Sequence, residues 1–150
     1  MLMSKRTVTI TPALSASPDY ASPDCIGVPI NIGDFDGIGG RAVELVSVVV
    51  KDLAAQGPAF TMYFFNGQPS GGTYTDNAAV SMNAADFAKF VGSYTVASAN
   101  YTTATYKFFS APNIRQRLNV DSALWVVIVA GGAYNAGTAS DLTIILGLDA

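Results

Sequence analysis

The chain has 150 residues, of which 50% are hydrophobic and only 13% charged, with a formal net charge of −3. This length suits one domain with a core of its own, and the acidic balance, with only Lys5/Arg6 and Arg115/Arg117 as basic clusters, excludes a nucleic acid partner. No apolar run approaches the length of a membrane span, and the N-terminus lacks the apolar segment of a signal peptide, so we expect neither.

The first 24 residues predict a short strand followed by an extended arm. Thr7–Ile10 alternates polar and apolar residues until Pro12 ends the run. Residues 13–24 repeat Ser-Pro-Asp and are typical of a surface arm, whose Tyr20 either anchors a neighbouring subunit or lies on its own domain. We therefore divide the single globular domain into a strand and arm, residues 1–24, and a β-sandwich, residues 25–150.

Residues 25–52 predict two strands around a glycine-rich turn. Cys25–Ile32 alternates, with Pro29 marking an edge or bulged strand, and Cys25 is expected to be a small core residue without a disulfide. Gly37–Ala42 loosely matches the G-x-G-x-x-A turn of nucleotide-binding proteins. However, the valines of Ala42–Asp52 favour a strand over the helix that such a turn opens, so we reject dinucleotide binding.

The central part of the chain predicts an aromatic strand, Ala59–Asn66, and a glycine-rich loop, Gly67–Thr75. One short helix is expected near residues 83–91, with Asn83 as its N-cap and Asp86 near its positive end. Further strands are predicted at Val91–Ala97, Tyr101–Ser110 and Ile114–Val120, with a turn at Asp121-Ser122.

The C-terminal stretch predicts two strands, Leu124–Val129 and Leu142–Leu146, joined by an ordered loop. The first is apolar on both faces, which suits a central strand that is covered on both sides. About eight or nine short strands with one helix predict an all-β fold, an antiparallel two-sheet sandwich of the jelly-roll kind.

Few chemistries are open to this composition. The chain has no histidine, which excludes imidazole-based catalysis and most zinc sites. Nearly all the aspartates adjoin Gly, Ser, Pro or Asn, where Asp caps backbone groups, so we expect no catalytic residues, no enzyme and no cofactor. Asp34 and Asp36 resemble half of a calcium loop that lacks its later ligands, and they are the weak metal candidates.

Paired arginines are the charged candidates for contact with a partner. Arg115 and Arg117 are expected on one exposed face of their predicted strand. They either grip a partner's carboxylates or lie at a solvated sheet edge.

Three stretches, SVVVKDLAAQGPAFTMYFF, TYTDNAAVSMNAADFAKFVGSYTV and ALWVVIVAGGAYNAGTASDLTIILGLDA, resemble small all-β head decoration proteins of tailed bacteriophages. These are also called auxiliary capsid or cement proteins. The resemblance covers the chain from about Gly40 to the end. It implies a virion structural protein that is made in the host cytoplasm, sits on the capsid surface, and binds the major capsid protein lattice and copies of itself, often as a trimer. No site residue carries over.

Three segments are the candidates for contact with other subunits: the arm with Tyr20, the tip Gly67–Tyr74, and the loop Gly131–Ser140, which contains Tyr134. The alternative is a fibre or tail component, or a receptor- or carbohydrate-binding β-sandwich that uses exposed Tyr74, Tyr101 and Tyr134. The sparse charge favours a protein that lies against neighbours, although an all-β protein rich in turns can have the same composition.

Overall fold

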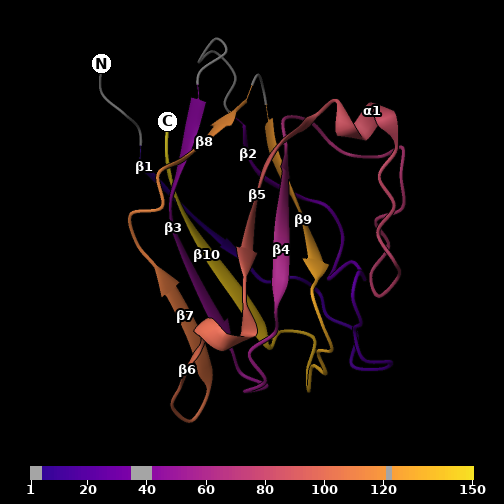
Figure 1. Cartoon of the computed structure of the whole chain (residues 1–150), viewed down its shortest axis with the longest axis vertical. Helices are drawn as coiled ribbons and strands as arrows, with labels where there is room; N and C mark the ends of the chain where they lie inside the picture. The colour runs from indigo at the N-terminus through magenta and orange to yellow at the C-terminus, as the bar shows by residue number, and fades with distance from the viewer. Residues whose placement is uncertain (1–4, 35–41, 121–122) are drawn as a thin grey trace.

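The computed structural model describes residues 5–34, 42–120 and 123–150, and it is a sandwich of two antiparallel sheets (Figure 1). The six-stranded sheet has the order β1-β10-β3-β7-β6, with β8 also pairing with β3, and the four-stranded sheet has the order β2-β9-β4-β5. The strands are β1 (Lys5–Ile10), β2 (Ile30–Asp34), β3 (Ala42–Asp52), β4 (Phe60–Phe65), β5 (Phe90–Val96), β6 (Thr102–Thr103), β7 (Lys107–Ala111), β8 (Gln116–Asn119), β9 (Ala123–Ala130) and β10 (Leu142–Asp149).

The strand pairing is nested. β1 pairs with β10, β2 with β9, β3 with β7 and β8, and β4 with β5, as in one long hairpin rolled up on itself. This nesting, divided between two facing sheets, is the topology of a jelly roll. The predicted all-β, two-sheet antiparallel sandwich is therefore confirmed.

β9 has apolar contacts on both of its faces. Val126 and Ile128 point between the sheets into the main core, and both are buried. Val127 and Val129 point the other way and form a second buried cluster with Cys25, Phe65 and Tyr74, against which Val80 and Met82 pack from the long loop after β4. The prediction of a central strand covered on both sides is confirmed, and Cys25 is a buried core residue as expected.

The predicted strand Cys25–Ile32 is wrong in its first half. Only Ile30–Asp34 forms β2, while Cys25 makes isolated bridges to Asp76 and Val129. Gly27 has a φ of +76°, in the left-handed region that glycine tolerates best, and it breaks the extended conformation. The alternation in the sequence reflects burial of Cys25 and Ile26 beside β9 and not a continuous ladder.

The helix is shorter than predicted. α1 spans Ala84–Phe87, and Asn83 is its N-cap as expected, with its side-chain oxygen accepting the Asp86 N–H at 2.9 Å. The expected continuation to residue 91 is wrong, because Phe90 begins β5 and pairs with Phe65. The Phe90 ring contacts Phe65 edge-on at 5.9 Å, so packing on the sheet outweighs helical spacing.

The predicted strand Tyr101–Ser110 is a hairpin. β6 and β7 pair through Thr102 with Phe108 and Thr103 with Lys107, which leaves residues 104–106 as the turn. None of these three residues is Gly, Pro, Asn or Asp, so no residue type here indicates a turn. A short 3-10 turn, η1 (Ser98–Asn100), precedes this hairpin.

β3 spans Ala42–Asp52 as predicted, so the chain continues as a strand where a nucleotide-binding turn would open a helix. The glycine motif itself, apart from Ala42, and the predicted Asp121-Ser122 turn lie outside the described residues. Within the described ranges, no helix is long and apolar enough to cross a membrane.

Candidate functional site

Four aspartates, Asp52, Asp76, Asp86 and Asp141, hold the loops of the sandwich in place. Three of them accept a hydrogen bond from a buried tyrosine hydroxyl: Tyr134 to Asp52 at 2.9 Å, Tyr20 to Asp76 at 2.7 Å, and Tyr74 to Asp86 at 2.6 Å. Each carboxylate also accepts backbone N–H groups. The expectation that an Asp beside Gly, Ser, Pro or Asn caps backbone groups is confirmed at Asp76 and Asp141, and Asp52 and Asp86, which lack such neighbours, do the same.

Asp52 closes the loop that follows β3. Its side chain is fully buried, and its carboxylate accepts the N–H groups of Ala54 at 3.0 Å, Gln56 at 2.7 Å and Gly57 at 2.8 Å. With the Tyr134 hydroxyl it has four donors, which satisfies a buried carboxylate that would otherwise be costly. Asp52 therefore has a structural role in holding this loop.

We expect Ala55→Gly to stabilise the protein by about 1 kcal/mol. Ala55 lies in this loop with a φ of 57°, a conformation that costs an L-residue with a Cβ about 1 kcal/mol more than glycine. Chemical denaturation of the purified protein measures the change. The matched control is Ala54→Gly at the preceding residue, whose own φ is not positive, and it should destabilise the protein instead. Equal effects of the two changes on stability would contradict the positive φ given to Ala55.

Asp76 fixes the segment between β1 and β2. It accepts hydrogen bonds from the hydroxyls of Tyr20 and Ser15 and from the Gly27 N–H at 2.7 Å. Tyr20 also exchanges two backbone hydrogen bonds with Tyr134, at 2.9 and 3.1 Å, and the two rings stack 6.2 Å apart. Burial raises the pKa of Tyr20 to about 12, with the Asp76 carboxylate adding to the shift.

These contacts correct the predicted partner residues Tyr20, Tyr74 and Tyr134. Their side chains are 1%, 8% and 1% exposed, so in this conformation none of the three can anchor a partner. Each is held inside by ring packing and by its carboxylate. Tyr101, the remaining aromatic of the carbohydrate-binding alternative, packs on Phe109 and donates its hydroxyl to the Pro58 carbonyl at 2.8 Å.

Asp86 holds the glycine-rich tip in place through hydrogen bonds to its backbone. Its carboxylate accepts the N–H groups of Ser70 at 3.0 Å, Gly71 at 3.0 Å and Gly72 at 2.7 Å, besides the Tyr74 hydroxyl. Burial acts to raise the pKa of Asp86, but these hydrogen bonds outweigh it and lower the pKa from 3.8 to about 2. The tip predicted as a contact loop is thus held in one conformation by Asp86.

The lowered pKa of Asp86 predicts acid sensitivity. Since the folded-state pKa lies below the unfolded value, the stability that this carboxylate contributes is fully present above about pH 5 and is lost as the pH falls toward about 2. We expect Asp86→Asn to be less stable at neutral pH and to lose less stability between pH 5 and pH 2.5. Urea denaturation at both pH values measures this. An unchanged pH dependence in Asp86→Asn would contradict the role given to Asp86. The hydroxyl and N–H of Thr138 also lower the pKa of Asp141, despite its burial. Asp141 should therefore account for part of the pH dependence of stability that remains in Asp86→Asn.

The arginine pair is only partly as predicted. Both side chains are exposed, but Arg115 precedes β8 and has a φ of 57°, so it does not share a strand face with Arg117. Asp36 lies outside the described residues, as does the side chain of Asp34 at the end of β2. Among the residues that the structure describes, no group of three or more Cys, Asp or Glu side chains could hold a metal ion.

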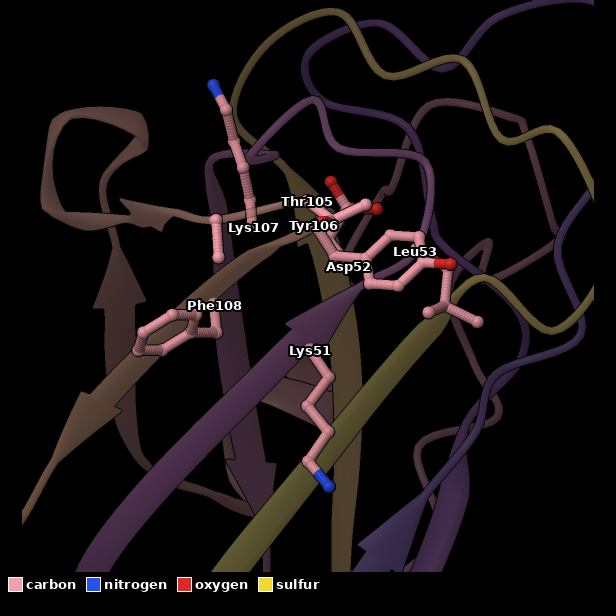
Figure 2. A pocket seen from close by; sticks show the side chains of 8 residues that line it. Lys51, Asp52, Leu53, Thr105, Tyr106, Lys107 and Phe108 are labelled. Atoms are coloured by element: carbon pink, nitrogen blue, oxygen red, sulfur yellow. The ribbon is translucent and has the colours of Figure 1, made fainter.

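A pocket lies where β3 ends beside the β6–β7 hairpin (Figure 2). It measures about 470 Å³, and three large apolar side chains that line it are unusually exposed, Leu53 at 52%, Tyr106 at 53% and Phe108 at 43%. Lys51 and Lys107 also line it, and their ammonium groups point away from its centre in Figure 2. The pocket was not predictable from the sequence, because it depends on the turn at residues 104–106, which was not predicted.

The outer face of the six-stranded sheet carries almost no charge in its middle. Strand register aligns Thr9, Ile145, Val49 and Ser110 in one row across four strands. Alternate residues of these strands, such as Val48, Val50 and Ile144, are buried in the core, so this row points outward. We call the outward residues Thr7, Thr9, Ser47, Val49, Ser110, Thr143 and Ile145 the flat face.

Charged residues lie at the two ends of the flat face. A row formed by Lys5, Asp149, Glu44 and Arg117 crosses one end of the sheet. Lys51, in register with Thr143 and Phe108, lies at the other end beside the pocket. An uncharged centre with a charged rim is the usual anatomy of a protein–protein interface.

Comparison of the sequence with protein-family models and with curated proteins gives no match. The described residues show carboxylates that are committed to loop structure and a broad uncharged sheet face.

Proposed function

We propose that the chain is a virion structural protein, a capsid decoration or cement protein that binds the outer surface of a bacteriophage head and stabilises the shell. The resemblance of its sequence to head decoration proteins suggests this function, and the flat face is the single observation that carries it. A sheet face open to solvent normally mixes charges of both signs, which keeps a protein soluble. Here the row Thr9, Ile145, Val49, Ser110 has none.

The fixed loops support the same function. Asp52, Asp76 and Asp86 hold their loops through hydrogen bonds to backbone N–H groups. A surface that is already ordered loses little conformational entropy when it binds a lattice. A protein that binds only the assembled shell stabilises it by mass action. Many copies that each bind weakly can therefore together raise the resistance of the head to rupture.

The test is to add purified protein to undecorated heads of the phage that encodes it. We expect the protein to sediment with the heads, to saturate at a fixed number of copies, and to raise the temperature at which the heads rupture. Protein that stays in the supernatant at saturating concentration, with no change in rupture temperature, would contradict the proposal. The carbohydrate-binding alternative is not proposed, because Tyr74 and Tyr134 are buried and no observation replaces them.

A further inference from the structure

The molecule is electrostatically two-sided. Figure 1 places the β6–β7 hairpin on one flank of the sandwich and the segment after β1, drawn in indigo, on the other. The hairpin flank carries Lys51 and Lys107. The other flank carries residues 11–30, which include Asp19 and Asp24 and no Lys or Arg. Opposite charges on opposite flanks favour head-to-tail contact between copies.

The pocket on the basic flank has an identifiable chemistry. Leu53, Tyr106 and Phe108 offer an apolar surface that is large for a side-chain cluster left in water. Among the described residues, neither the Lys51 nor the Lys107 ammonium group has a hydrogen bond or ion pair. A ligand with an apolar side chain would pack on the apolar surface, and carboxylates beside it would pair with the two ammonium groups.

The acidic flank supplies such a side chain. Apart from the three pocket residues, the exposed large apolar side chains among the described residues are Val28 at 57% and Phe87 at 67%. Val28 lies in the segment that contains Asp19 and Asp24. Phe87 instead stacks on Phe90, follows the buried and fully bonded Asp86, and precedes Lys89 by two residues. Charge complementarity therefore selects Val28.

We propose that the pocket of one copy binds the Val28 surface of a second copy, with Asp19 and Asp24 facing Lys51 and Lys107. The two surfaces are different parts of the chain, so the contact is heterologous, and repetition of it closes a ring or extends a chain of copies. The contact involves no capsid. It is therefore tested on the isolated protein, and its failure would leave the proposed binding to heads untouched.

The experiment uses sedimentation velocity of the full chain over a range of concentrations. The wild type should associate beyond the monomer, and less so in high salt, because the charged contacts are screened. Lys51→Glu with Tyr106→Ser removes the pocket surface, and Asp19→Lys with Val28→Lys removes the acidic surface. Each double variant alone should associate at least about tenfold more weakly. An equimolar mixture of the two should form dimers, because one intact contact remains between unlike copies.

Phe87→Ser is the matched control, an equally exposed aromatic side chain outside the contact, and it should associate like the wild type. Circular dichroism on heating checks that every variant is folded. The proposal is overturned if the wild type stays monomeric at all concentrations, if either double variant associates like the wild type, or if the mixture stays monomeric. Association of the acidic-surface variant alone would show that pocket contacts pocket.

Discussion

Replacing Asp52 by alanine is expected to destabilise the protein by about 4 kcal/mol, which for a chain of 150 residues lowers the melting temperature by about 10 °C. The variant leaves three backbone N–H groups and the Tyr134 hydroxyl without their acceptor in a buried site. Water can replace only part of these bonds, since the Asp52 side chain has no exposed surface. Calorimetry and urea denaturation measure the loss.

Two further variants make this result interpretable. Asp52→Asn keeps one acceptor oxygen but turns an amide donor toward N–H donors, so it should cost about 2 kcal/mol and remain measurable if the alanine variant does not fold. Asp19→Asn removes an exposed carboxylate of the same type and should change stability by less than about 0.5 kcal/mol. If Asp52→Ala is as stable as Asp19→Asn, the loop is not held as described.

Placing two glutamates on the flat face, Val49→Glu with Ile145→Glu, is expected to weaken binding to heads at least about 100-fold. The two residues are direct cross-strand neighbours at the centre of that face. Binding to the shell would remove water from two neighbouring carboxylates that have no cationic partner, which costs several kcal/mol. Co-sedimentation with undecorated heads measures the apparent dissociation constant.

The matched control places the same charges on the other sheet. Thr61→Glu with Thr95→Glu also puts two glutamates directly opposite each other in an antiparallel pair, on the outer face of the four-stranded sheet. The cost to folding should be similar in both double variants, whereas only the first should lose binding. Equal loss of binding would mean that the shell contacts something other than the flat face.

The strands were largely predictable because their residues obey local rules. β3 matches its predicted bounds since its valines leave few other conformations open, and β9 was placed correctly at the centre of its sheet because it is apolar on both faces. The two errors have different origins. At Cys25–Ile32, burial of Cys25 and Ile26 beside β9 resembles a strand although only isolated bridges form there. At Tyr101–Ser110, residues 102–106 are exposed, and the turn contains no Gly, Pro, Asn or Asp that would have indicated it.

The candidate site was much less predictable. Tyr134 and Asp52 are 82 positions apart in the chain, and Tyr20 and Asp76 are 56 apart. The residues beside most of the aspartates indicated that they cap backbone groups, but only the fold shows which tyrosine each one holds. For the same reason, tyrosines that suggested a binding surface are core residues. The flat face depends on the register of four strands, which no single segment specifies.

The most direct measurement is a reconstruction of heads decorated with the purified protein by electron cryomicroscopy. The proposed function predicts density for the jelly roll on the outer surface, with the sheet containing β1, β10, β3 and β7 turned toward the shell and Val49 and Ile145 at the contact. Heads that carry the protein with that sheet facing solvent would contradict the role of the flat face. Bare heads at saturating protein would contradict the proposed function itself.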